Sequence, residues 1–174
     1  RLIDKDTGEV FKFSSREELN YFKYQRYLKR YLRTIASIDE SVGSILDYLE
    51  ENKLENDTIV IYTSDQGFFL GEHGWFDKRF MYEESLQMPF LVRYPRKIQA
   101  KTVCKNIICN VDFAPTLLDL AGLAIPNYMQ GVSFRPLLEG NKPENWSEIA
   151  YHRYWMHRDP DHNAYSHYGI RNQQ

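Results

Sequence analysis

The residues best suited to do chemistry stand directly after a short apolar run. Asp65 and Gln66 follow residues 59–62, and together a carboxylate and an amide oxygen offer two hard oxygen ligands. Such ligands suit Ca²⁺ or Mg²⁺ better than zinc. Two ligands do not hold such an ion alone, so the others would have to come from elsewhere. On spacing alone, a turn-initiating Asp ahead of Gly67 is the simpler interpretation.

A loop punctuated by glycines follows and contains His73 and Lys78. Glycines allow a backbone to come close to an anion, and a lysine ammonium acts on the oxygens of an anion as a compact point charge. A lysine in a polar loop is also commonly just solvated. The loop by itself therefore does not establish an anion site.

The elements that must position these residues alternate between helix and strand. The apolar run 59–62 predicts a strand buried on both faces, as in a parallel sheet covered by helices, and residues 89–95 predict a second strand. In open sheets of this kind, sites form beyond the carboxyl ends of the strands, which is where Asp65 emerges. The order helix, strand, loop, strand, helix predicts an α/β fold with a smaller terminal unit.

A long helix precedes the first strand. It begins with a capping-box pattern, in which Ser14 and Ser15 are each followed three residues later by a glutamate. Apolar residues then recur every seven positions, which predicts one long helix or two abutting helices ending near Asn52. Gly43 interrupts the pattern and is interpreted as a place where a neighbouring backbone comes close. A short helix is expected from Asp112 to Gly122, and short strands between residues 149 and 170.

Composition excludes several classes of protein. Apolar residues make up 43% of the chain, charged residues 26%, and the net charge is −2, which is typical of a globular protein without a basic field for nucleic acid. The basic and aromatic stretch 23–33 fits a solvated helix face better than a polyanion site. No stretch approaches the length of a membrane span. Cys104 and Cys109 form neither a disulfide framework nor a metal cluster.

Four histidines near the end of the chain stand five residues apart, a period that fits neither a helix face nor one side of a strand. They are His152, His157, His162 and His167. Scattered surface histidines explain this spacing better than a zinc cluster does.

An ordered set of segments resembles the sulfatase family of the alkaline-phosphatase superfamily. The segments are IDESVG at 38–43, IVIYTSDQG at 59–67, LGEHG at 70–74, Lys78, YEES at 82–85, MPF at 88–90, VDFAPTLLDLAG at 111–122 and QGVS at 130–133. The match extends roughly from Tyr27 to Arg171 and is most similar to carbohydrate sulfatases, including those that act on 6-sulfated N-acetylglucosamine. It outweighs the simple turn interpretation of Asp65.

The resemblance implies roles for single residues. Asp65 and Gln66 match two calcium ligands of the family, with Mg²⁺ the less suited ion. Lys78 matches a catalytic lysine that contacts the sulfate group and the leaving oxygen. His73 is expected on the substrate side. His167 resembles a segment near the substrate entrance, and a purely structural strand histidine is the alternative there.

The resemblance also implies an organisation. The family nucleophile is a formylglycine made within a Cys/Ser-x-Pro-x-Arg motif, which the sequence around Cys104 and Cys109 does not match. We therefore expect the carboxyl-terminal half of a sulfatase, inactive alone and partnered by a missing amino-terminal half that supplies the formylglycine. Residues 1–125 would belong to the catalytic α/β domain, with its mixed sheet flanked by helices, and residues 126–174 to a smaller α+β subdomain. A sulfated carbohydrate is the expected substrate, and a periplasmic, secreted or lysosomal location is expected.

Two other functions remain open. A phosphoester hydrolase or transferase of the same superfamily usually carries Asp-His where this chain has Asp65 and Gln66, so Gln66 disfavours it. A non-catalytic glycan-binding remnant is disfavoured because Asp65, Gln66 and Lys78 are all retained.

Overall fold

The computed structural model describes residues 1–158 and 160–173. The chain divides into two compact units, Arg1–Asn52 and Lys53–Gln174, which are described separately. The predicted boundary near residue 125 lies within the second unit and stays a prediction.

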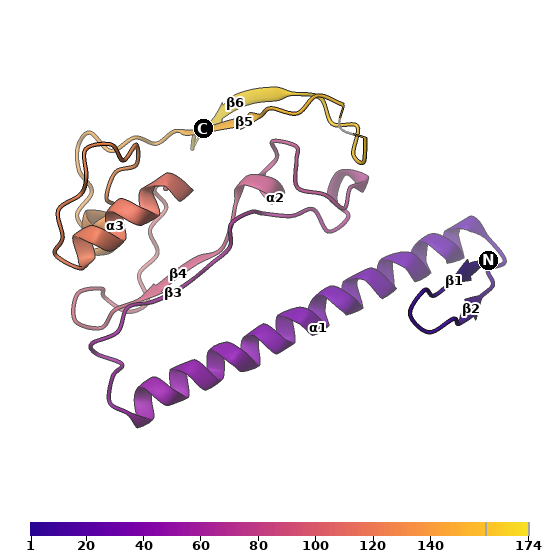
Figure 1. Ribbon diagram of the computed structural model, residues 1–174, viewed down its shortest axis with the longest axis horizontal. Coiled ribbons are helices and arrows are strands. Elements are labelled where there is room, and N and C mark those ends of the chain that lie inside the picture. The colour runs from indigo at the N-terminus through magenta and orange to yellow at the C-terminus, as the bar shows by residue number, and fades with distance from the viewer. Residues whose placement is uncertain (159, 174) are drawn as a thin grey trace. The chain divides into compact units, whose positions relative to one another are not determined.

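The first unit is a small hairpin followed by one long helix (Figure 1). Strand β1 (Leu2–Ile3) pairs antiparallel with β2 (Val10–Phe11), and α1 (Arg16–Glu51) runs uninterrupted for 36 residues. The single-helix alternative is therefore the right one. Among the described residues, a Cβ placed on Gly43 would meet no atom within 4 Å, so the close approach of a neighbouring backbone stays a prediction.

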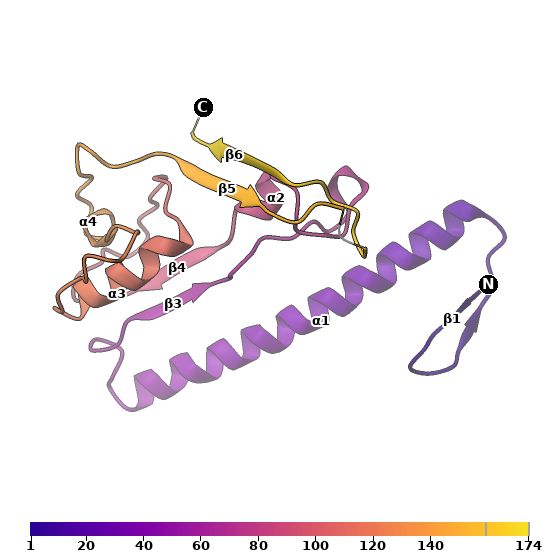
Figure 2. The ribbon, with the colours of Figure 1, turned by 45° about the horizontal axis from the view of Figure 1, so that its top comes forward.

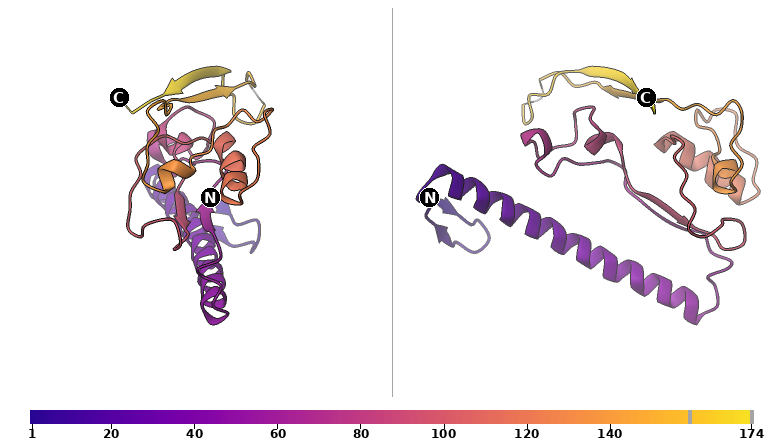
Figure 3. Two further views of the ribbon diagram at one scale, coloured as in Figure 1. Left: turned by 90° about the vertical axis from the view of Figure 1, so that its left-hand side faces the viewer. Right: turned by 180° about the vertical axis from the view of Figure 1, so that it is seen from behind.

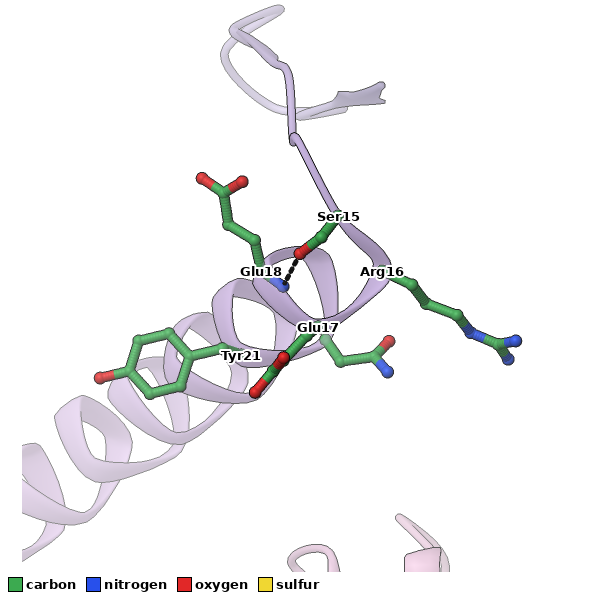
Figure 4. A pocket seen from close by; sticks show the side chains of 6 residues that line it. Ser15, Arg16, Glu17, Glu18 and Tyr21 are labelled. Carbon is green, nitrogen blue, oxygen red and sulfur yellow. Dashed lines mark hydrogen bonds between the residues drawn. The ribbon is translucent and has the colours of Figure 1, made fainter.

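The start of α1 confirms the predicted cap. The Ser15 hydroxyl accepts a hydrogen bond from the backbone N–H of Glu18 at 3.1 Å, which satisfies one of the unpaired donors of the first turn (Figure 4). The Glu18 carboxylate reaches back to the N–H and the hydroxyl of Ser14, and these hydrogen bonds lower the pKa of Glu18. A shallow surface pocket beside this cap is lined by exposed residues between Ser15 and Tyr21.

The hairpin is anchored by a buried carboxylate. Asp4 is only 4% exposed and accepts hydrogen bonds from the backbone N–H groups of Asp6 and Thr7 at 2.8 and 3.0 Å. It also forms ion pairs with Arg26 and Arg30 of α1. The charge is thus fully compensated, which a buried carboxylate requires.

The second unit contains two separate antiparallel sheets of two strands each (Figure 2). Strand β3 (Val60–Thr63) pairs with β4 (Phe90–Arg93), and β5 (Ala150–Tyr154) pairs with β6 (His167–Arg171). The expected strands are confirmed. Within the described residues, however, β3 pairs only with β4, and this pairing is antiparallel. The residues of β3 are half-buried. The parallel neighbouring strands that the apolar run predicted are not present in the described part of the chain.

Short helices complete the second unit. They are η1 (Glu72–Gly74), α2 (Glu83–Leu86), η2 (Asn110–Asp112), α3 (Phe113–Leu120) and α4 (Arg135–Leu138). Gly122 ends α3 with a φ of +73°, as its position predicted. Within the described residues, no helix has both the length and the apolar character that crossing a membrane demands.

The core of the second unit consists of two aromatic clusters. Phe90, Phe113 and Phe134 pack with ring centroids 5.3–6.0 Å apart and join β4 to α3. Phe69, which is fully buried, makes edge-to-face contacts with Trp75 and Tyr82. The second cluster fixes the loop between β3 and α2, which carries most of the predicted site.

Candidate active site

Asp65 is exposed just beyond the end of β3, as predicted. Its backbone carbonyl accepts a hydrogen bond from the side-chain amide of Asn110 at 3.1 Å, which holds the main chain. Among the described residues, its carboxylate has one hydrogen-bonding contact, with the Ser64 hydroxyl at 3.4 Å. No cationic side chain in residues 1–158 or 160–173 forms an ion pair with it, so its oxygens remain available to a ligand.

The orientation of the Gln66 amide follows from its surroundings. Its Nε2 lies 2.7 Å from the Ser85 carbonyl, 3.2 Å from the Ser85 hydroxyl and 3.4 Å from the Lys78 carbonyl. The Ser85 hydroxyl donates its own hydrogen to the Lys78 carbonyl, so it acts as an acceptor toward the amide. A flipped amide would set its oxygen against these acceptors. The amide nitrogen therefore faces Ser85, and Oε1 points away from it.

This arrangement fits part of a calcium site. An exposed carboxylate and an adjacent amide whose oxygen faces away from Ser85 both offer hard oxygen atoms to a cation. In the part of the chain that the structure describes, no group of three or more His, Cys, Asp and Glu residues gathers closely enough to hold a metal.

Lys78 is exposed and its main chain is fixed. Its carbonyl accepts hydrogen bonds from the Ser85 hydroxyl and from Gln66. No carboxylate of the described residues forms an ion pair with its ammonium group. A cation held at its base and unpaired at its tip is suited to bind an anion.

Gly67 allows α2 to lie directly against this loop. Its N–H donates to the Ser85 carbonyl at 3.2 Å, and a Cβ at this position would stand 2.2 Å from the Glu84 carbonyl oxygen. Contacts that short do not occur, so the approach requires a residue without a side chain.

His73 lies on the same loop, in an unusual backbone conformation. Its φ of +56° is in the left-handed region, which is uncommon for a residue other than glycine. Its ring packs on Tyr82 with centroids 4.4 Å apart, and its Nε2 lies 3.4 Å from a carboxylate oxygen of Glu84. The ring is thus oriented by Glu84 while remaining partly exposed.

His167 is packed behind the Lys78 loop rather than facing solvent. Its ring stacks on Phe80 with a centroid distance of 6.0 Å and on His152 at 5.5 Å. Its Nδ1 lies 2.8 Å from the Tyr165 carbonyl, and its Nε2 is buried without a hydrogen-bond partner among the described residues. Burial, with a smaller contribution from His167, lowers the pKa of His152.

The turn that connects these residues is α2, which sequence reasoning did not single out. Ser85, fully buried, holds Gln66 and Lys78, and Glu84 contacts His73. Glu83 forms a two-pronged ion pair with Arg171 of β6, at 2.8 and 3.2 Å, which ties the β5–β6 hairpin to the same turn (Figures 2 and 3). The segment YEES was visible in the sequence, but no spacing rule reveals partners that lie 7 to 88 residues away.

Asp65 thus adjoins Gln66 in the chain, and Ser85 contacts both the Gln66 amide and the backbone carbonyl of Lys78. The structure places His73 next to them through Glu84. His167 contacts Phe80, two residues from Lys78. Its Nε2 is buried and so is not accessible to a ligand bound at Asp65, Gln66 and Lys78.

Comparison with known proteins adds independent findings. The family described as N-sulphoglucosamine sulphohydrolase, C-terminal, matches residues 71–174. An N-acetylglucosamine-6-O-sulfatase of Bacteroides thetaiotaomicron is 51% identical over 154 residues, which is 87% of this chain and 27% of that protein. The chain therefore spans about a quarter of the length of this relative.

Two solved structures are similar in backbone over much of this chain. One, a complex with D-glucosamine-2-N,6-O-disulfate as substrate, matches 91% of this chain and 32% of its own with a TM-score of 0.87 and 48% identity. The other, a phosphonate monoester hydrolase from Silicibacter pomeroyi, matches 67% of this chain and 23% of its own with a TM-score of 0.62 and 30% identity. Given the family match over more than half of its residues, the chain belongs to the sulfatases, in the family defined by the carboxyl-terminal region of N-sulphoglucosamine sulphohydrolase.

Proposed function

We propose that this chain forms the carboxyl-terminal part of a carbohydrate sulfatase that hydrolyses the 6-O-sulfate ester of a glucosamine or N-acetylglucosamine residue. The observation that carries the proposal is the shared frame of Gln66 and Lys78 on Ser85, next to the Asp65 carboxylate. Likeness to an N-acetylglucosamine-6-O-sulfatase and to a structure holding a disulfated glucosamine supports the choice of substrate.

In this proposal the side-chain oxygens of Asp65 and Gln66 would hold Ca²⁺, and the remaining ligands would be supplied by an amino-terminal part of the same protein. Mg²⁺ is the less suited ion because it demands near-ideal octahedral geometry. The bound ion would stabilise negative charge on the sulfate oxygens. The amino-terminal part would also supply the formylglycine nucleophile.

Lys78 has the most direct chemical role. Its ammonium group binds the sulfate oxygens and neutralises the charge that develops on the departing sugar oxygen. The Ser85 hydroxyl fixes the backbone at Lys78, so the position from which the flexible side chain reaches the sulfate is set before that charge appears.

The two histidines act on the substrate side. His73, oriented by Glu84, donates or accepts a hydrogen bond with a sugar hydroxyl. His167 shapes the wall behind Lys78 by stacking on Phe80, and its Nε2 would reach a sugar only if that stack opened.

Likeness to a phosphonate monoester hydrolase makes that reaction the second candidate. Both reactions need a cation and a lysine to neutralise a tetrahedral oxyanion group, so the residues of this chain serve either one. Gln66 in place of a histidine favours the sulfatase, since an amide oxygen is a ligand for calcium rather than for zinc.

The test is a comparison of substrates on the full-length protein that carries this chain. Release of sulfate from 6-O-sulfated N-acetylglucosamine and hydrolysis of a phosphonate monoester are measured with and without added Ca²⁺. We expect Ca²⁺-dependent release of sulfate and little phosphonate turnover. Preferred turnover of the phosphonate would support the second candidate. Binding of the sulfated sugar without turnover of either compound would leave a glycan-binding protein.

Lys78→Ala isolates the role of the lysine. We expect kcat to fall about 10²–10³-fold, the usual effect of removing one charge-stabilising donor, while calcium affinity is unchanged. Lys101→Ala, at an exposed loop lysine, serves as the matched control and should leave kcat as it is. Unchanged turnover in Lys78→Ala would remove Lys78 from the chemistry.

A further inference from the structure

Ser85 has an unusual set of contacts for a small residue. It is fully buried on α2, and its hydroxyl donates to the Lys78 carbonyl while lying 3.2 Å from Nε2 of Gln66. Its own carbonyl accepts from the same Nε2 at 2.7 Å and from the N–H of Gly67 at 3.2 Å. One residue therefore contacts both the predicted amide ligand and the base of the predicted catalytic lysine.

We propose that Ser85 is a positioning residue that sets the polarity of the Gln66 amide and thereby the cation affinity of the site. The proposal rests on the function proposed above. An amide can bind a cation only through its oxygen, because its NH₂ group carries hydrogen-bond donors. Whichever group faces Ser85 decides which one is left for the cation.

The hydroxyl matters separately from the carbonyl. Because its hydrogen is committed to the Lys78 carbonyl, the hydroxyl oxygen offers lone pairs to the amide and cannot donate to it. Without the hydroxyl, Nε2 loses one of its three nearby acceptors, and the Lys78 carbonyl keeps only the 3.4 Å contact from Gln66. The flipped amide then becomes less unfavourable, and the lysine loses the stronger of its two anchors.

A purely structural role predicts a different outcome. Removing any buried hydroxyl leaves its former partners unsatisfied and lowers stability. Such a loss does not by itself change calcium affinity or turnover of the molecules that remain folded. Calcium affinity is therefore the readout that separates the two roles.

Thr116 provides a matched control. It is 2% exposed, its hydroxyl donates to the Asp112 carbonyl at 2.6 Å, and the hydroxyl accepts from the N–H of Phe134 at 2.9 Å. Thr116→Val thus removes an equally buried and equally bonded hydroxyl that touches neither Gln66 nor Lys78.

The experiment uses the full-length protein with Ca²⁺ alone as the probe, titrated by calorimetry, and with melting temperature and kcat measured in parallel. For Ser85→Ala we expect the Kd for Ca²⁺ to rise about tenfold and kcat to fall at least as much. Thr116→Val should lower the melting temperature comparably and leave both quantities within about twofold. Ser85→Cys, a weaker donor of similar shape, should show the same trend and replaces Ser85→Ala if that variant does not fold.

A double-mutant cycle tests the route through Gln66. If Ser85 acts on calcium through the amide, then Ser85→Ala should change the Kd of a Gln66→Ala protein by less than about twofold. A full tenfold effect in that background would overturn the route. An unchanged Kd in Ser85→Ala, with a lowered melting temperature, would overturn the proposal while leaving the sulfatase function intact. A wild-type protein that neither binds Ca²⁺ nor releases sulfate would overturn the proposed function itself.

Discussion

Replacing Gly67 by alanine tests how closely α2 must approach the loop after β3. The new Cβ would lie 2.2 Å from the Glu84 carbonyl oxygen and 2.7 Å from that of Ser85. A carbon and a carbonyl oxygen in contact are normally about 3.3 Å apart, so one segment must move by about 1 Å. Both obstacles are backbone atoms, and a change of rotamer therefore cannot relieve the clash.

The displacement acts directly on the site, because Gly67 adjoins Gln66 and Ser85 holds both Gln66 and Lys78. A misplacement of about 1 Å costs on the order of a hundredfold in catalytic efficiency, and overpacking of this kind costs about 1–3 kcal/mol of stability. We expect Gly67→Ala to lower kcat/KM for sulfate release about a hundredfold. The assay is steady-state release of sulfate by the full-length protein, with thermal unfolding measured on the same samples.

Gly43 is the matched control, since a Cβ there meets none of the described residues within 4 Å and the residue lies inside α1. Gly43→Ala should stabilise the helix by about 0.5–1 kcal/mol and leave turnover unchanged. Wild-type kcat/KM and melting temperature in Gly67→Ala would show that α2 does not pack tightly against this loop. Ser85 would then not hold Gln66 and Lys78 in place as described.

Two further predictions concern stability. Glu148 accepts hydrogen bonds from Lys142 and the Ile107 N–H, which lower its pKa to about 2. The stability that the Glu148 carboxylate contributes is therefore present above pH 4.5 and is lost as pH falls from there toward 2. The melting-temperature difference between wild type and Glu148→Gln should shrink over that range, and a constant difference would contradict the assignment. Asp4→Ala should release the β1–β2 hairpin, because Arg26 loses its buried partner, and should speed hydrogen exchange in the hairpin while α1 stays protected. Asp6→Ala, at a single exposed contact of 3.3 Å, should change exchange little, and equal effects of the two substitutions would show that burial of Asp4 is not what anchors the hairpin.

Local signals in the sequence predicted most of the elements. The Ser15 cap, the seven-residue apolar repeat, the run before Asp65 and Gly122 each act through neighbours within a few residues, and each produced the expected element. The sequence could not decide what Gly43 faces, because a glycine in a helix face has the same pattern whether a neighbour approaches or solvent does.

Contacts across long separations were not predictable in the same way. The period of five among the histidines fits no helix face or strand, yet antiparallel pairing of β5 and β6 brings His152 and His167 to 5.5 Å. The roles of Ser85 and Arg171 depend likewise on which segments meet at α2. Only the ordered set of segments, compared as a whole with the sulfatases, indicated that Asp65, Gln66 and Lys78 belong to one site.

The single turn of α2 is a common anchor for the residues around it. One hydrogen bond or ion pair joins residues 83–85 to each of Gln66, Lys78, His73 and Arg171. The spacing of these four residues therefore does not depend on the long stretches of chain between them. When the turn is displaced by thermal motion, these groups are carried with it, and their mutual separations vary less than their absolute positions do. If α2 moved relative to another part of a longer protein, the distances from these four residues to groups in that part would change. The distances among the four residues would stay nearly the same.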